Sequence, residues 1–178
     1  MIVSPKEVLD FWFEECEPSD WFKKSEAFDA EIRTRFLETY EAIVSGDTAE
    51  WRKSAHGRLA EIIVLDQFSR NMFRDDAKAF AADELAVELA KEALPYWDEF
   101  SIQERSFVVM PFMHSESLAV HDWAVKWFDE PGLERRKKYE LMHREIIERF
   151  GRYPHRNHVL GRTSTPEEEA FLKEHPGF

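Results

Sequence analysis

The stretch LAEIIVLDQFSRN, residues 59–71, decides the fold of this chain. An amphipathic surface helix carries its apolar side chains on one stripe, but here they cover nearly the whole circumference of a helix. The apolar residues of the stretch are Leu59, Ile62, Ile63, Val64, Leu65 and Phe68. A helix that is apolar all round must be covered by its neighbours, so the stretch predicts a helix at the centre of the protein.

Helix signals recur on both sides of this central helix. Ser4, Ser101 and Thr165 each stand three residues before a glutamate, which is the spacing of a capping box that begins a helix. Gly46 and Gly151 follow amphipathic runs and predict helix ends. The other segments predicted to be helical are the short run after Ser4, 28–43, 48–53, 76–94, 101–111, 117–129, 133–150 and the short run after Thr165.

Two prolines mark further boundaries. Pro95 ends the alanine-rich segment 76–94, and Pro111 predicts a kink or a stop in the helix that begins at Ser101. No strand pattern, linker, low-complexity segment or fixed-period repeat is present. The sequence therefore predicts an all-α fold, a single helical domain over residues 1–178 with seven to nine helices in stacked antiparallel pairs.

The composition limits the class of protein and of partner. The chain has 178 residues, a formal net charge of −12 and 43% hydrophobic residues, enough for one domain with a sizeable core. Its acidity disfavours nonspecific binding to nucleic acid or an anionic membrane, and no apolar run is long enough to span a bilayer. The one cysteine, Cys16, excludes an internal disulfide, and no signal peptide is visible. We therefore expect a cytoplasmic protein that has neither nucleic acid nor membrane as partner.

Four polar residues interrupt the central helix near its end. Asp66 and Arg70 are four residues apart, as are Gln67 and Asn71, so the members of each pair lie side by side on a helix. A carboxylate on a buried helix needs a charged or hydrogen-bonding partner, which Arg70 supplies locally. The four residues therefore form either a satisfied internal network that orders the helix end or part of a ligand site.

A second polar stretch, from His143 to Arg162, is basic although the chain is acidic. It holds five arginines against two glutamates. Arginine offers a fork suited to phosphate or carboxylate, and histidine donates or accepts a hydrogen bond near neutral pH. His143 lies on the apolar stripe of a helix, and the residues that follow it and predict ligand binding are Arg152, His155, Arg156, Asn157 and Arg162. The alternative interpretation is a C-terminal segment tied to the acidic surface by salt bridges.

The sequence His114-Ser115-Glu116, which follows Pro111, is the third polar candidate. The His-x-Glu spacing occurs in zinc deaminases, but those enzymes also need a downstream Pro-Cys-x-x-Cys, which this chain lacks. His114, Glu116 and His143 offer two imidazoles and one carboxylate to a metal, yet no typical metal-ligand spacing accompanies them. We therefore predict neither a metal nor a cofactor.

Several short sequence motifs, spread in order over essentially the whole chain, carry a family resemblance. They are Asp10-Phe11-Trp12-Phe13, Trp21-Phe22, LDQFSRN at 65–71, Phe80 with Asp83, His114-Ser115-Glu116, FGRYPHRN at 150–157, and Leu160-Gly161-Arg162 with Thr165. In these motifs the chain resembles the bacterial domain of unknown function 924 family, although Tyr153 stands where phenylalanine is common. The resemblance implies a tetratricopeptide-like fold of stacked antiparallel helices with a concave face. It implies no activity, because none is established for the family.

These polar residues predict a site for a small anionic ligand, with hydrolase or transferase chemistry at a phosphate or carboxylate centre. The expected catalytic residues are His143, His114, Glu116 and Asp66. One of the histidines would transfer the proton, and one of the carboxylates would orient that histidine. The hypothesis requires the three polar stretches to meet in space.

The expected ligand-binding residues include Gln67, Asn71 and the arginines Arg70, Arg152 and Arg156, which would hold the anion. A first alternative is an interaction module in which a tetratricopeptide-like groove binds an acidic peptide through the same arginines. A second alternative is a purely structural network. A closed pocket with histidine and carboxylate within hydrogen-bond reach favours an enzyme, and a long open groove favours a peptide.

Overall fold

The structure is a computed structural model that describes residues 1–177, and within that range it contains helices and no strand. The α-helices are α1 Pro5–Asp10, α2 Glu26–Ser45, α3 Ala55–Ile63, α4 Ser69–Met72, α5 Asp83–Ala93, α6 Ile102–His114, α7 Leu118–Ala124, α8 Glu134–Phe150, α9 Asn157–Leu160 and α10 Pro166–Glu174. The π-helical turns are η1 Phe11–Glu15 and η3 Val64–Phe68, and the 3-10 segments are η2 Ala49–Lys53, η4 Ala77–Phe80, η5 Leu94–Glu99, η6 Val125–Phe128 and η7 Pro154–Arg156. With α3, η3 and α4 counted as one continuous helix, the described range holds nine α-helical segments, which confirms the predicted all-α class. None of these helices is long and apolar enough to cross a membrane.

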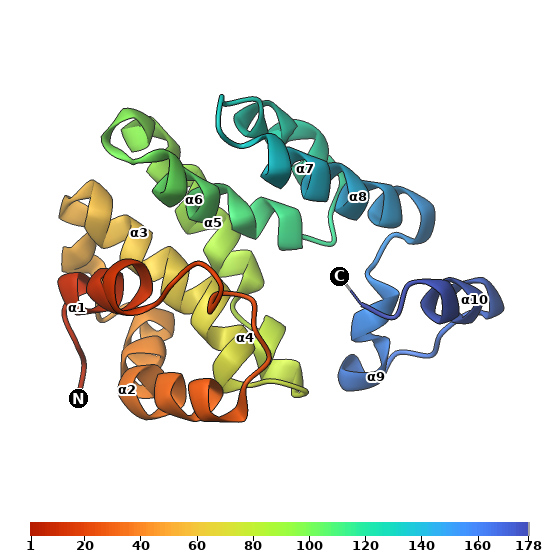
Figure 1. Ribbon diagram of the computed structural model, residues 1–178, viewed down its shortest axis with the longest axis horizontal. Coiled ribbons are helices and arrows are strands. Elements are labelled where there is room, and N and C mark those ends of the chain that lie inside the picture. The colour runs from red at the N-terminus through yellow and green to blue at the C-terminus, as the bar shows by residue number, and fades with distance from the viewer. Residues whose placement is uncertain (178) are drawn as a thin grey trace.

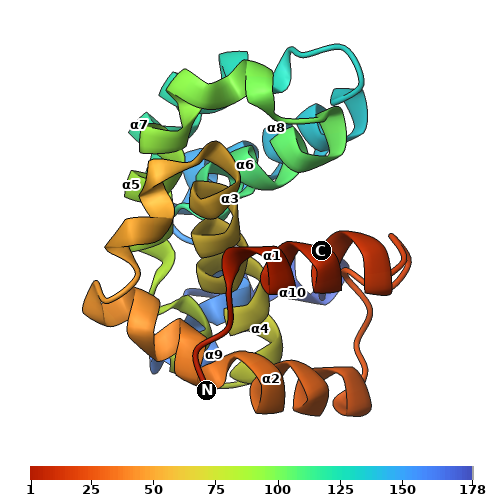
Figure 2. The ribbon, with the colours of Figure 1, turned by 90° about the vertical axis from the view of Figure 1, so that its left-hand side faces the viewer.

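The predicted central helix is α3, which continues through η3 and α4 to Met72. Every side chain from Leu59 to Ser69 is buried. The helix packs against α1, α5 and α6, and Figure 2 shows it in the middle of the molecule with α1 and α2 below it and α6 above. The stretch that is apolar all round is therefore covered on all sides, as predicted.

The predicted helix boundaries are confirmed where a capping residue sets them. Ser4, Ser101 and Thr165 each accept a hydrogen bond from the main chain three residues on, and the glutamate there returns one. Gly46 and Gly151 end α2 and α8 in the left-handed conformation, which glycine adopts without the penalty a side chain would bring.

The helix that begins at Ser101 does not stop at Pro111. Helix α6 continues to His114 with Pro111 inside it. Proline removes one helix hydrogen bond, but the eight residues from Ser106 to Met113 are all buried, so packing holds the last turn in place. Of the two predicted effects of Pro111, the stop is therefore wrong and the kink stays a prediction. The continued helix brings His114 to the end of α6.

The alanine-rich segment 76–94 is not one helix. It forms η4, then a break at Ala81 and Ala82, and then α5, which begins at Asp83. The break separates Phe80 from Asp83 and turns both residues toward the end of α4, because η4 packs against α4.

Helices that are neighbours along the chain also pack against each other, as α5 does on α6 and α7 on α8. Figure 1 shows the chain progressing from α1 and α2 on one side of the molecule to α9 and α10 on the other. This arrangement is compatible with tetratricopeptide-like stacking, which stays a prediction in its detail. A second, smaller core of Ile146, Ile147 and Tyr153 lies where α8 meets the C-terminal segment.

We expect Gly57→Ala to destabilise the protein. A methyl group at Gly57 would lie 1.9 Å from the main-chain oxygen of Trp51, so the backbone would have to move. Overpacking of this kind costs about 1–3 kcal/mol. The matched control is Gly46→Ala, where the added methyl meets nothing within 4 Å and only the left-handed backbone is penalised, by about 1 kcal/mol. Urea unfolding should show the larger loss for Gly57→Ala, and an equal loss in both variants would contradict the close approach.

Candidate functional site

The three polar stretches predicted from the sequence meet at His114, the last residue of α6. Asp66, in η3, lies with its Oδ1 atom 2.7 Å from Nδ1 of His114. Arg156, in η7, donates from Nη2 to the main-chain oxygen of His114 at 2.8 Å. Residues about 40 positions apart are thus joined at one point, as the hypothesis of a common site requires.

Asp66 and His114 form a buried carboxylate–imidazole pair. Burial would raise the pKa of Asp66, but the neighbouring His114 and Arg70 outweigh it and hold that pKa below its ordinary value. Burial also lowers the pKa of His114, although Asp66 opposes the shift, so the ring is neutral near pH 7. A neutral ring that bonds a carboxylate donates from Nδ1, which leaves Nε2 as an acceptor without a hydrogen-bond partner among residues 1–177.

The partners of the central helix's polar residues are not the local ones that the sequence suggests. Arg70 lies 3.8 Å from Asp66 but makes its closer contacts with Asp83, at 2.5 and 3.0 Å. Gln67 donates to Asp66 at 2.8 Å, whereas Asn71 donates to Asp29 at 2.9 Å. The helix end is therefore tied to α2 and α5 as well as to itself.

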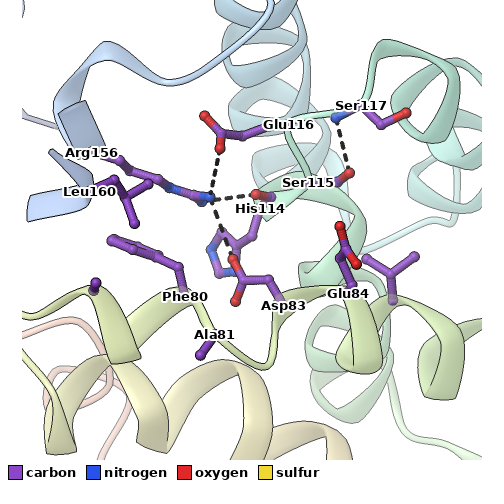
Figure 3. Close-up of a pocket in the computed structure, with 12 residues that line it drawn as sticks. Phe80, Ala81, Asp83, Glu84, His114, Ser115, Glu116, Ser117, Arg156 and Leu160 are labelled. Carbon is purple, nitrogen blue, oxygen red and sulfur yellow. Dashed lines mark hydrogen bonds and ion pairs between the residues drawn. The ribbon is translucent and has the colours of Figure 1, made fainter. Parts of the chain in front are cut away.

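A hollow of about 430 Å³, which we call the Phe80 hollow, opens at this meeting point. Figure 3 shows Arg156 reaching across it above Phe80, toward Asp83, Glu116 and the carbonyl of His114. The guanidinium lies 3.5 Å from Asp83 and 3.9 Å from Glu116, and 4.4 Å from the centre of the Phe80 ring. Arg156 is thus held between two carboxylates and an aromatic face.

The charges around the Phe80 hollow largely balance one another. Its wall carries the carboxylates of Asp83, Glu84 and Glu116 and the guanidinium of Arg156. Arg70 also lies against Asp83, and Arg162 against Glu116. The arginine that lines the hollow already contacts two carboxylates, so little of its positive charge is left for an anionic ligand.

Glu116 binds the C-terminal segment to the end of α6 through hydrogen bonds. It accepts hydrogen bonds from Arg162 at 3.0 and 3.1 Å and from the main-chain N–H of Tyr153 at 2.7 Å. Burial would raise the pKa of Glu116, but these two donors outweigh it and keep that pKa below its ordinary value. Arg162 also donates to Asn157 and to the main-chain oxygen of Tyr153, so all three nitrogen atoms of its guanidinium group donate within the protein.

The other basic residues of the late stretch also bind within the chain. Arg152 makes a bidentate pair with Glu168 of α10, which lowers the pKa of Glu168 to about 2. Asn157 donates to the same carboxylate at 3.2 Å, and His155 donates to the main-chain oxygen of His175 at 2.6 Å. That these residues bind a ligand stays a prediction, since their present partners belong to the fold.

His143 lies close to this cluster, on the buried face of α8. It donates from Nδ1 to the main-chain oxygen of Tyr139 at 2.7 Å, and burial lowers its pKa to about 3. The centre of its ring is 5.6 Å from the centre of the Tyr153 ring, and the guanidinium of Arg156 lies 4.8 Å from the centre of that same ring. His143 and Arg156 therefore flank one side chain, as a shared site requires.

A second hollow, of about 320 Å³, lies between α6 and α8, and we call it the α6–α8 hollow. It is lined by Phe22, Met110, Met113, His114, Arg135, Arg136, Tyr139 and His143. Both predicted acid–base histidines thus lie on its wall, and no aspartate or glutamate does. Among the described residues, neither Arg135 nor Arg136 lies within 4.0 Å of a carboxylate oxygen, and Nε of Arg136 is buried without a hydrogen-bond partner.

Arg135 and Arg136 are the residues that the sequence reasoning missed. The signal is the run Arg135-Arg136-Lys137-Lys138, four successive cations in an acidic chain. Glu140 stands four residues after Arg136, at the spacing of a helix ion pair. In the structure that carboxylate is buried against Nδ1 of His121 instead, so Arg136 has no partner on its own helix.

His121 and Glu140 form a second buried histidine–carboxylate pair that the sequence reasoning missed. The ring also bonds through Nε2 to the main-chain oxygen of Ser115 at 2.6 Å. Both ring nitrogens are therefore used within the fold. No group of three or more His, Cys, Asp and Glu side chains is placed to hold a metal ion anywhere in the described range.

The comparisons with known proteins concern the whole chain. The family model described as "Bacterial protein of unknown function (DUF924)" matches residues 8–176. A solved structure of a protein of unknown function from Agrobacterium tumefaciens is similar, with 36% sequence identity and a TM-score of 0.90. The similarity covers 96% of this chain and 97% of that one. No curated protein matches.

Glu116→Ala is expected to lower the free energy of unfolding by about 2 kcal/mol, because it removes one partner of a partly buried ion pair and leaves charged and main-chain donors uncompensated. The control is Glu148→Ala, which removes an exposed partner of Arg144 and should cost less than about 1 kcal/mol. Urea unfolding at pH 7 measures both. Similar losses would show that the contacts of Glu116 with Arg162 and Tyr153 do not hold the C-terminal segment.

The buried His143 should make the protein less stable in mild acid. Its pKa in the folded state, about 3, lies below the ordinary value of 6.5, so only the unfolded state takes up its proton as the pH falls below 6.5. One such group costs about 2 kcal/mol between pH 7 and pH 5. Urea unfolding of His143→Leu at pH 7, 6 and 5 should show a correspondingly shallower decline than the wild type. Parallel declines would contradict a neutral, buried His143.

Proposed function

The chain belongs to the DUF924 family of bacterial proteins of unknown function, and on that premise we propose that it binds a small anionic ligand in the α6–α8 hollow. The carrying observation is the pair Arg135 and Arg136, two guanidinium groups without a carboxylate partner on the wall of that hollow. Arg136 is partly buried, where a cation without a counter-charge is costly, and the exposed Arg135 adds a second positive charge beside it. Arginine binds phosphate or carboxylate in a bidentate manner.

The electrostatic setting supports an anion in this hollow. Burial lowers the pKa of Arg136, and Arg135 beside it lowers that pKa further, so the protonated form lacks the stabilising charge that a bound anion would supply. The chain carries 36 acidic residues, yet none lines the hollow. The proposal thus keeps the predicted class of ligand and assigns its charge to Arg135 and Arg136 in place of Arg70, Arg152 and Arg156.

The proposed chemistry is hydrolysis or group transfer at the bound phosphate or carboxylate. His114 is the favoured general base, because its Nε2 atom is an open acceptor and Asp66 orients the ring through Nδ1. Glu116 is bound to Arg162 and contributes less readily. His143 is neutral near pH 7 and lies on the same wall, where it contacts the ligand through a hydrogen bond or by packing against it.

A cytoplasmic location is part of the proposal. The single cysteine, Cys16, is buried and unpaired, which suits a reducing compartment.

Calorimetric titration with inorganic phosphate and with acetate tests the anion site. Arg136→Gln and Arg135→Gln are each expected to weaken binding about tenfold, since one charge-assisted hydrogen bond is worth about 1.5–3 kcal/mol. The melting temperature of Arg136→Gln should not fall, because the substitution removes an unpaired charge.

The matched control is Arg144→Gln, the same change on the same helix at an arginine that pairs with Asp122 and Glu148. It should bind both anions as the wild type does. The proposal fails if the wild type binds neither anion at millimolar concentration, or if the control weakens binding as much as Arg136→Gln.

A further inference from the structure

A third hollow adjoins the proposed anion site. It has a volume of about 560 Å³, and we call it the Trp21 hollow. Phe22, Arg135 and Arg136 line both this hollow and the α6–α8 hollow. The two guanidinium groups that lack a carboxylate partner therefore stand on the boundary between two cavities. His114 lines one of these cavities and not the other.

Phe22 forms part of that boundary. Its ring is stacked on Phe107 with 6.4 Å between ring centres and carries the guanidinium of Arg136 at 5.0 Å from its own centre. The side chain is nevertheless 57% exposed, which is unusual for phenylalanine. A ring that packs on the core and is still exposed can contact a ligand in either of the two hollows that it lines.

The Trp21 hollow is mainly apolar. Trp21, Ile102 and Leu133 contribute to its wall, and no aspartate, glutamate or histidine does. Trp21 is fixed because its indole N–H donates to the main-chain oxygen of Trp12 at 2.8 Å. Ser106 donates to the main-chain oxygen of Gln103 at 2.6 Å, so its hydroxyl proton is also used. The exposed apolar surface of the hollow comes mainly from Phe22 and Ile102, because Trp21 and Leu133 are buried. Besides the two arginines, Ser19 and Gln103 are the exposed polar residues on its wall.

We infer that the ligand is an elongated amphipathic anion, with its phosphate or carboxylate between Arg135 and Arg136 and an apolar group in the Trp21 hollow. The inference rests on the proposed anion site and adds the chemical class of the rest of the ligand. Apolar surface lies here beside cations that have no carboxylate partner, which suits a ligand with both an anionic and an apolar group. An anion without an apolar group would leave the Trp21 hollow to water, and an apolar molecule without a charge would leave the arginines without a counter-charge. In this orientation the anionic end faces the α6–α8 hollow and His114.

The test compares calorimetric titrations of inorganic phosphate, hexyl phosphate and phenyl phosphate. The wild type is expected to bind at least one of the two organic phosphates tenfold or more tightly than inorganic phosphate. The hexyl and phenyl arms separate a flexible chain from an aromatic ring as the apolar group. Hexanol, which has the chain without the anion, should bind no more tightly than inorganic phosphate.

Variants that fill the Trp21 hollow separate this inference from the anion site. Gln103→Trp places an indole in the hollow from an exposed position at the start of α6, and it should abolish the gain while leaving the affinity for inorganic phosphate unchanged. Gln103→Ala is the matched control, because it empties space and should keep the gain. Ser19→Trp, at another exposed residue of the wall, provides a second filling variant if the first one folds poorly.

The possible results distinguish the two proposals. If inorganic phosphate binds but neither organic phosphate binds more tightly, or if the gain survives both filling variants, the inference is overturned and the anion site stands. If no phosphate binds at all, the anion site falls and the inference falls with it. Tighter binding of an acidic tetrapeptide than of either organic phosphate would also overturn the inference and favour a peptide partner.

Discussion

Asp66 is a carboxylate with 1% of its surface exposed, on the helix around which the other helices pack. In that position it must be paired and hydrogen-bonded, because an isolated buried charge would cost more than the fold can supply. Its partners come from three places: Gln67 beside it, Arg70 one turn on, and His114 at the end of α6. The π-helical turn η3 lies at this point, as such turns often do where a polar group has to be aimed within a helix.

The need to neutralise buried charge extends from Asp66 through the rest of the polar network. Arg70 balances Asp66 and Asp83 together, and Arg156 shares Asp83 with it. Because these arginines are committed to the fold, they are poor candidates for a ligand's charge. Arg135 and Arg136 differ from them in contacting aromatic rings and no carboxylate, so their charge is not neutralised within the fold. This difference is a better guide to a ligand site than the density of arginine along the chain.

The sequence predicts well what depends on neighbouring residues. The central helix follows from its apolar circumference, and the helix at Ser101 begins where its capping box places it. What fails depends on distant contacts. Helix α6 passes Pro111 because its last turns are buried. Arg135 and Arg136 were not predicted as site residues, because only the tertiary contact of His121 with Glu140 leaves Arg136 without a carboxylate on its own helix. The meeting of Asp66 with His114 was a question of tertiary packing that no local pattern could answer.

The contacts of Glu116 have a consequence for the order in which the chain assembles. Tyr153 and Arg162, which bind its carboxylate, follow it by 37 and 46 residues. The buried residues of the main hydrophobic cluster run from Val8 to Phe128, so that cluster can form without either donor. Until the C-terminal segment packs against α6, Glu116 is a solvated carboxylate at the end of that helix. Its charge is therefore neutralised by the packing of the C-terminal segment, which couples the burial of Glu116 to the last long-range contacts that the fold makes.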